Sequence, residues 1–208
     1  MDRQYPALPI RELGDGAGLR RPTQPHAARV GLESPALSAM TDLRLGSAAT
    51  IRPQAPAGGA NQFMITRGVR LLLVVDDREA VLGVLSAADI LGERAIQVAA
   101  ERRMPRDELN VVDLMTPASR VEVLAIADVQ AARVGHVLET LRRSGRQHIL
   151  VVEDDVAPAA GPLDKPLHRT MVRGLFSLSQ IARQLGVLVQ TSGEVARTFA
   201  EIESAIVR

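Results

Sequence analysis

A hydroxyl and a carboxylate stand three residues apart at Ser86 and Asp89, directly after the apolar segment Val81–Leu85. If that segment is a strand and a helix begins at Ser86, both side chains lie at a helix N-terminus, where backbone N–H groups lack partners. Such N–H groups and a serine hydroxyl together suit a phosphate. A carboxylate one turn into the helix can accept both hydroxyls of a ribose. Gly83 would let a ligand or a neighbouring backbone approach the strand closely.

The same pair also has a purely structural interpretation. In a capping box, Ser86 accepts a hydrogen bond from the backbone N–H of Asp89, and Asp89 reaches back to the amide of Ser86. Any helix that follows a strand can carry this arrangement. The residues alone leave both interpretations open.

A related segment occurs later in the chain, where Ser177 is followed after three residues by Gln180 in place of an acid. A capping box tolerates this change, whereas a ribose site loses the charge-assisted hydrogen bonds of a carboxylate. We therefore expect the segment around Asp89 to bind a ligand better, and the one around Gln180 to be weak, differently selective or empty.

No other residues form a catalytic or metal-binding pattern. The chain has no cysteine, which excludes disulfides, zinc–thiolate sites and thiol catalysis. Its four histidines are far apart in sequence and fall in no metal-ligand spacing. Asp76-Asp77 and Asp154-Asp155 stand at predicted hairpin turns, which aspartate favours. We expect neither an enzyme nor a metal site.

Composition excludes further classes of function. Of the 208 residues, 46% are apolar, which supports a packed core, while 2% are aromatic and leave few platforms for stacking bases. Lys and Arg number 25 against 24 Asp and Glu, so the basic excess of a duplex-binding protein is missing. The start of the chain lacks the apolar stretch of a signal peptide, and the longest strongly apolar run, Leu71–Val75, falls far short of the roughly 20 residues that span a bilayer. We expect a cytoplasmic protein without membrane or nucleic-acid partners.

Three blocks of sequence recur in the same order, which indicates an internal repeat. The matching blocks are Ala39–Asp42 with Leu114–Pro117, Gly68–Asp76 with Gly145–Glu153, and Val81–Ser86 with Val172–Ser177. The second copy is longer, and its extra residues fall in the loop-like stretch 157–166.

Each copy has the same predicted elements. A short strand is followed by a helix, a hairpin of two buried strands and a second helix that begins at the serine. Gly68 and Gly145 stand where helix C-caps are needed. The predicted segments are short strands near 50–51 and 120–124, helices near 61–66 and over 129–143, and hairpin strands 70–75 with 81–85 and 148–152 with 171–176.

This order of motifs resembles the CBS domain, named after cystathionine β-synthase, and two copies resemble the tandem CBS pair or Bateman module. The resemblance implies an α+β fold with one β-α-β-β-α unit per copy and the two copies packed as a pseudo-twofold pair. It also implies adenosine-containing ligands in the clefts between copies, and a homodimer. Adenine contacts would fall near Thr41, Ile51, Arg70, Leu71, Thr116, Val121, His148 and Ile149. For Arg70 the alternative is a solvated side chain, and for His148 a half-buried structural histidine.

The chain divides into an N-terminal extension over 1–33, repeats over 34–103 and 104–190, and a C-terminal helix over 191–208. The extension is rich in Pro and Gly, and we expect an arm that wraps the body or stays mobile. In the last segment Val195, Phe199, Ile202 and Ile206 form one apolar helix face. That face either packs on its own repeats or contacts a second copy or a regulated partner.

The expected function is regulatory. An adenine nucleotide (AMP, ADP or ATP) or a related adenosyl ligand would shift the shape or pairing of the module, and no cofactor would be required. The output would pass to a protein partner that the sequence does not identify. The alternative is a ligand-free scaffold for dimerisation or partner docking, in which Ser86 and Asp89 serve as helix caps.

Overall fold

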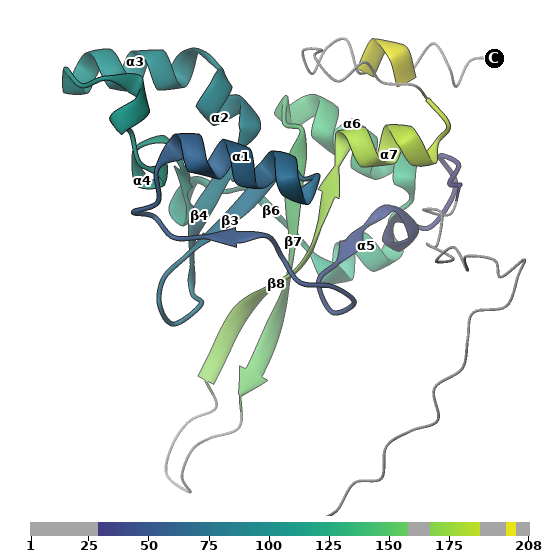
Figure 1. Cartoon of the computed structure of the whole chain (residues 1–208). Helices are drawn as coiled ribbons and strands as arrows, with labels where there is room; N and C mark the ends of the chain where they lie inside the picture. Colours follow the sequence, from purple (N-terminus) through teal and green to yellow (C-terminus); the bar gives the residue numbers. More distant parts are fainter. Residues whose placement is uncertain (1–28, 158–166, 188–198, 203–208) are drawn as a thin grey trace, which may run out of the picture.

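The computed structural model describes residues 29–157, 167–187 and 199–202. In it the chain forms two four-stranded sheets, each covered by helices, as the repeats predict (Figure 1). Helices α1 to α4 gather over the first sheet and α5 to α7 over the second, while the β7–β8 hairpin projects away from the helices. The predicted α+β fold with two similar units is confirmed.

The first repeat opens with a single 3-10 turn and ends in a cluster of short helices. Its elements are η1 (Ala36–Ala39), β1 (Thr41–Asp42), β2 (Thr50–Ile51), α1 (Ala57–Arg67), β3 (Leu71–Val75), β4 (Val81–Ser86), α2 (Ala87–Leu91) and α3 (Glu93–Arg102). Gly68 ends α1 with φ of 64°, a left-handed conformation that glycine adopts without strain.

The second repeat has the same order of strands, with further short helices between them. Its elements are η2 (Arg106–Glu108), α4 (Val111–Leu114), β5 (Thr116–Pro117), η3 (Ala118–Arg120), β6 (Val123–Ala125), α5 (Ile126–Ala131), α6 (Val134–Ser144), β7 (His148–Ala157), β8 (Leu167–Ser177) and α7 (Leu178–Gln184). Gly145 ends α6 with φ of 63°, as Gly68 ends α1.

The two repeats exchange their first strands. The sheet orders are β2-β3-β4-β5 and β1-β8-β7-β6, so each repeat contributes one short strand to the sheet of the other. Gly83 and Gly174 lie where these strands pair: a Cβ at Gly83 would come within 2.3 Å of the Thr116 carbonyl oxygen, and one at Gly174 within 2.7 Å of that of Thr41. The close approach expected at Gly83 is therefore made by a neighbouring backbone.

The cores follow this exchange. Ala36, Ala39 and Met40 are buried with the helices of the second repeat, whereas Leu109 and Leu114 are buried with those of the first. Leu73, Val75 and Leu150 form a third cluster where the two sheets meet. The repeat boundaries at 34, 104 and 191 stay a prediction, and packing joins the start of each repeat to the core of the other one.

The prediction of a single helix over 129–143 is wrong. The chain is extended at Ala132 and Arg133, between α5 and α6. There the Ala132 carbonyl accepts from the amide of Ala36 at 3.0 Å, and the amide of Val134 donates to Ser34 at 2.9 Å. Pairing with the segment before η1 thus replaces helical hydrogen bonds, a tertiary effect that local periodicity does not reveal.

The second hairpin is longer than predicted. Strands β7 and β8 pair from His148–Ser177 as far as Ala157–Leu167, beyond the predicted ends at 152 and 171. Part of the extra length of the second repeat therefore extends the hairpin. The rest of the predicted loop, 158–166, lies outside the described residues.

The flanking segments are described in part. Val30 is buried, and its amide donates to the Gln184 carbonyl at 3.1 Å, so residues 30–33 pack on the second repeat. Phe199 and Ile202 are buried in the core of the same repeat, which supports packing of the apolar face on its own repeats. Residues 1–28, Val195 and Ile206 lie outside the described residues.

Candidate functional site

A cavity of about 240 Å³ lies between the repeats and brings together six of the predicted site residues. The volume lies just below the usual range of about 300–1,000 Å³ for small-molecule sites. The predicted residues that line it are Thr41, Arg70, Leu71, His148, Ser177 and Gln180, joined by Leu43, Ser47, Ala48, Ala49, Gly68, Val69, Leu175, Ser179 and Arg183.

Both repeats position these side chains. Thr41 lies in the exchanged strand β1, opposite Leu175 of β8. Arg70 follows the left-handed turn at Gly68, just before β3, and His148 opens β7 opposite Ser177. Gln180 and Arg183 are one turn apart on α7 and therefore share a helix face. The cavity exists only where the two repeats meet.

Hydroxyl and amide groups meet in this cavity. The Thr41 hydroxyl donates to Oε1 of Gln180 at 2.9 Å, and the hydroxyls of Ser177 and Ser179 are 3.1 Å apart. Ser177 begins α7 without a side-chain cap hydrogen bond. Ser177 and Gln180 therefore do not form the capping box that their spacing allows. Both residues line the cavity instead.

The cavity is lined by cationic and neutral groups. Arg70 and Arg183 line it, and no Asp or Glu of the described residues does so. Burial, together with the charge of Arg70, lowers the pKa of His148 to about 4. His148 is therefore neutral at pH 7 and has one donor and one acceptor nitrogen. This environment suits an anionic group more than a cationic one.

Ser86 and Asp89, the first-repeat counterparts of Ser177 and Gln180, lie close together outside this cavity. Oδ2 of Asp89 accepts from the amide of Ser86 at 2.8 Å and from its hydroxyl at 2.6 Å, and the Asp89 amide donates to the Ser86 hydroxyl at 3.3 Å. The capping box is therefore formed. Oδ1 of Asp89 lies 3.4 Å from Nη1 of Arg94, which also lies 3.5 Å from the Thr116 hydroxyl.

Three of the predicted adenine contacts pack within the protein and do not line the cavity. Ile51 packs against the first-repeat core, Ile149 is buried in the second-repeat core, and Val121 packs where the sheets meet. Their apolar side chains contribute to the hydrophobic clusters of the protein. Gly83, Ser86, Asp89 and Thr116 also lie outside the cavity.

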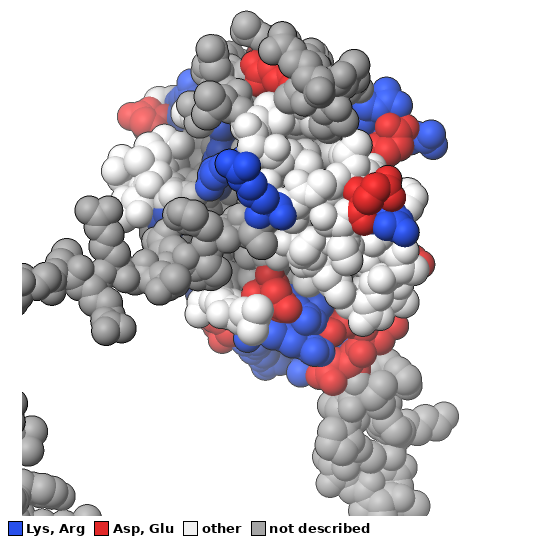
Figure 2. Space-filling view, turned by 90° about the vertical axis from the view of Figure 1, so that its right-hand side faces the viewer, with Lys and Arg blue, Asp and Glu red and all other residues white. Residues whose placement is uncertain are grey.

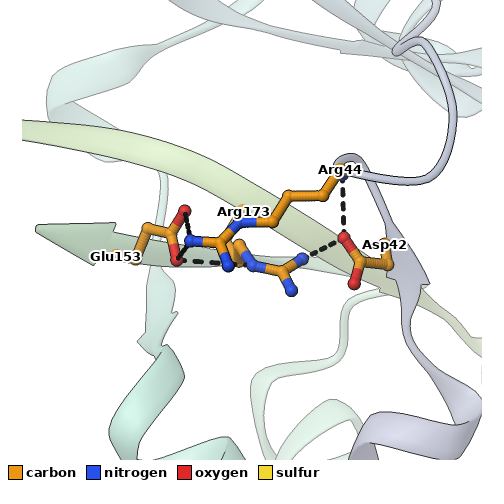
Figure 3. A network of polar contacts seen from close by, with 4 residues as sticks. All are labelled: Asp42, Arg44, Glu153 and Arg173. Atoms are coloured by element: carbon orange, nitrogen blue, oxygen red, sulfur yellow. Dashed lines mark hydrogen bonds and ion pairs between the residues drawn. The ribbon is translucent and has the colours of Figure 1, made fainter. Parts of the chain in front are cut away.

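An ion-pair network secures the strand that carries Thr41. Asp42 accepts from the Arg44 amide at 2.8 Å and from the Arg173 guanidinium, which also lies 3.3 Å from Glu153 (Figure 3). Arg44 donates to both Glu153 oxygens at 2.8 Å. The Arg173 hydrogen bond lowers the pKa of Asp42 below its usual value. These contacts join β1 to both strands of the long hairpin.

Sequence reasoning missed Arg183, Ser179 and Arg94. Arg183 could have been found, because it stands one turn beyond Gln180 on a predicted helix. No signal in the sequence pointed to Arg94, since its contacts with Asp89 and Thr116 depend on how α3 turns after α2. The backbone of residues 47–49 enters the cavity through an irregular segment that periodicity does not describe.

The surface offers no other strong indication of a charged ligand on the face shown in Figure 2. There, basic and acidic side chains lie next to one another, beside a wide area without charge. Within the described residues, no helix combines the length and apolar character needed to cross a membrane.

Comparison with known families agrees with the resemblance found in the sequence. Residues 40–95 match the family model of the CBS domain. The second repeat has the same order of strands, which agrees with the resemblance to a tandem CBS pair. Among curated proteins, none matches this chain.

Solved structures match the chain over most of its length. An uncharacterised conserved protein from Pyrococcus horikoshii is 20% identical, with a TM-score of 0.50 over 78% of this chain and 99% of its own. CBSX2, solved in complex with AMP, is 17% identical, with a TM-score of 0.45 over 72% and 94%. The CBS domain pair of protein MJ0100, solved with 5-methylthioadenosine and S-adenosyl-L-methionine, is 16% identical, with a TM-score of 0.44 over 71% and 97%.

Proposed function

We propose that this chain is a regulatory module that binds an adenine nucleotide of the AMP, ADP or ATP class in the cavity between its repeats. The cavity carries the proposal, because both repeats line it and its polar groups converge on one space. No catalytic step is assigned, and the nucleotide acts as a regulatory ligand and not as a cofactor.

The charge of the cavity selects among adenosyl ligands. Arg70 and Arg183 favour a phosphate, and the absence of a carboxylate among the described lining residues removes the natural partner of a cationic sulfonium. A nucleotide should therefore bind more tightly than adenosine, and adenosine more tightly than S-adenosylmethionine. Apolar side chains of Leu43, Leu71 and Leu175 supply walls for a purine.

Signalling follows from the position of the cavity. A ligand that touches Thr41 from one repeat and Gln180 from the other stabilises the arrangement in which both are near. It shifts the population of that arrangement by its difference in affinity between states. The changed surface then acts on a protein partner or on a second copy of the chain, as the resemblance to CBS pairs implies.

A thermal-shift series tests the proposal. At 100 times its dissociation constant a ligand adds about 2.7 kcal/mol, and each kcal/mol raises the melting temperature of a protein of this size by roughly 2–4 °C. AMP, ADP or ATP should therefore raise it by about 5–10 °C. Adenosine and S-adenosylmethionine are the comparison ligands at equal concentration.

A matched pair of arginine variants assigns the binding to the cavity. Arg183→Ala should reduce the shift, whereas Arg169→Ala, an exposed arginine outside the cavity, should leave it unchanged. Equal shifts in both variants would place binding elsewhere.

The second candidate function is the ligand-free scaffold. It is favoured by the capping box, because Ser86 and Asp89 satisfy each other without any ligand. An unchanged melting temperature with all of these ligands would support the scaffold and reject the nucleotide sensor.

A further inference from the structure

The repeat symmetry places a counterpart of the cavity residues around Asp89. The exchanged-strand residue Thr41 corresponds to Thr116, and Ser177 and Gln180 correspond to Ser86 and Asp89. In the sheet of the second repeat, the exchanged strand β1 and the helix α7 border the cavity. In the first repeat the equivalent pair is joined by a side chain that the second repeat does not have.

That side chain is Arg94, at the start of α3. Its Nη2 donates to the Met115 carbonyl at 2.9 Å, and its Nη1 lies 3.4 Å from Asp89 and 3.5 Å from the Thr116 hydroxyl. Arg94 thus connects the first repeat to the strand that the second repeat inserts into its sheet. A planar guanidinium suits three such acceptors, because its donors point in fixed directions.

Both carboxylate oxygens of Asp89 already have contacts, two on Oδ2 and one on Oδ1. Ser86 holds Oδ2 through its amide and hydroxyl, and Arg94 holds Oδ1. The Asp89 side chain is only 18% exposed. A diol that approached Oδ1 would have to displace the guanidinium and the charge interaction it makes.

By the sequence offset between the repeats, the second repeat has an apolar residue in place of Arg94, and helix α7 runs unbroken to Gln184 where α2 ends at Leu91. Since 180 − 89 and 185 − 94 are both 91, Leu185 corresponds to Arg94. Leu185 packs against the second-repeat core. Gln180 instead meets the hydroxyl of Thr41, and the space beside it stays open.

We propose that Arg94 is a specificity-determining residue that closes the first-repeat counterpart of the cavity, so that each chain takes one nucleotide and takes it beside Gln180. This rests on the proposed function and deepens it, because it decides which of two related positions is used. The proposal is the opposite of the expectation from sequence, in which the segment around Asp89 binds the ligand better than the segment around Gln180.

Isothermal titration of the full chain with AMP tests the closure. The wild-type chain should bind one AMP, and Arg94→Leu, which installs the residue of the second repeat, should bind two. The double variant Arg94→Leu/Asp89→Ala should return to one, because position 89 then has no polar side chain to hydrogen-bond the nucleotide. Arg169→Ala, an exposed arginine elsewhere, should keep one site.

Each other result has a definite meaning. One AMP in both the wild type and Arg94→Leu rejects the closure and leaves the proposed function intact. Two AMP in the wild type also rejects the closure. No AMP in the wild type and one in Arg94→Leu supports the closure and rejects the cavity as the nucleotide site, while no AMP in either rejects both. If Arg94→Leu shows no cooperative unfolding, Arg94→Gln replaces it with the same expected count.

Discussion

The hydroxyl of Thr41 donates a 2.9 Å hydrogen bond to the side chain of Gln180, 139 residues further along the chain. The contact joins the exchanged strand β1 to helix α7 of the other repeat. It forms because β1 pairs with β8, which leads directly into α7. The cavity between the repeats is therefore a product of the strand exchange.

Replacing Thr41 by Val removes this hydrogen bond at nearly constant side-chain size. The free energy of unfolding should fall by about 1 kcal/mol, because Gln180 loses a partner in a partly buried position. The thermal shift with AMP should shrink as well. Thr170→Val in the exposed part of β8 is the matched control, measured by urea unfolding and by AMP titration. Equal AMP responses of the two variants would contradict the placement of the ligand.

Asp89→Ala separates the cap from the ligand site. The variant should lose about 1 kcal/mol of stability, because α2 loses its capping box. Its AMP affinity should equal that of the wild type, since Asp89 lies outside the cavity. Asp128→Ala is the control, because Asp128 stands in the first turn of α5 without a capping box. Loss of the AMP response in Asp89→Ala alone would favour the sequence-based expectation of a site at Asp89.

The repeats and most elements follow from local sequence patterns. Leu71–Val75 and Val81–Ser86 carry continuous apolar strands, and glycines mark both helix ends at Gly68 and Gly145. The exchange of β1 and β5 between the sheets could not be predicted from the sequence. A two-residue strand has no periodicity, and tertiary contacts decide which strand it pairs with.

The site was predictable in part for a similar reason. The serine of the motif recurs as Ser86 and Ser177, and Gln180 stands in the place of Asp89, so these positions are visible in the sequence. Which of the two copies is open depends on Arg94, whose partners Asp89 and Met115 come from different repeats. Contacts of that kind are set by packing and carry no local signature.

Gly83 should be hard to replace. A Cβ there would lie 2.3 Å from the Thr116 carbonyl oxygen, so Gly83→Ala must displace the exchanged strand β5, at a cost of about 3 kcal/mol. Gly174→Ala should cost a similar amount, because its Cβ would meet the Thr41 carbonyl at 2.7 Å.

The control for these glycine variants is Gly59→Ala, in helix α1 with open space around it. Its stability should be unchanged or higher by up to about 1 kcal/mol, because alanine favours a helix. Urea unfolding measures all three variants. A Gly83→Ala protein as stable as Gly59→Ala would contradict the close pairing of β4 with β5.

His148 should make stability depend on pH between about 6.5 and 4. Its folded pKa is about 4, lowered by burial and then by Arg70, against 6.5 when exposed. The unfolded chain therefore binds a proton at His148 over this range and the folded chain does not. Stability is fully present above pH 6.5 and falls as the pH is lowered, by about 1 kcal/mol per pH unit.

His148→Gln removes this titration and keeps a polar side chain at the cavity. Melting temperatures measured from pH 7.5 to 4 should fall less steeply for the variant than for the wild type. His136→Gln, whose imidazole accepts from the Arg133 amide at the start of α6, is the histidine control. Parallel curves for the wild type and His148→Gln would contradict the lowered pKa of His148.

The most direct test of the nucleotide sensor is a crystal structure of the full chain grown with AMP. We predict electron density for one nucleotide, with its phosphate near Arg70 or Arg183 and the rest of the molecule between Thr41 and Gln180. Density beside Asp89 instead, or a cavity without nucleotide at an AMP concentration that saturates binding in solution, would contradict the account.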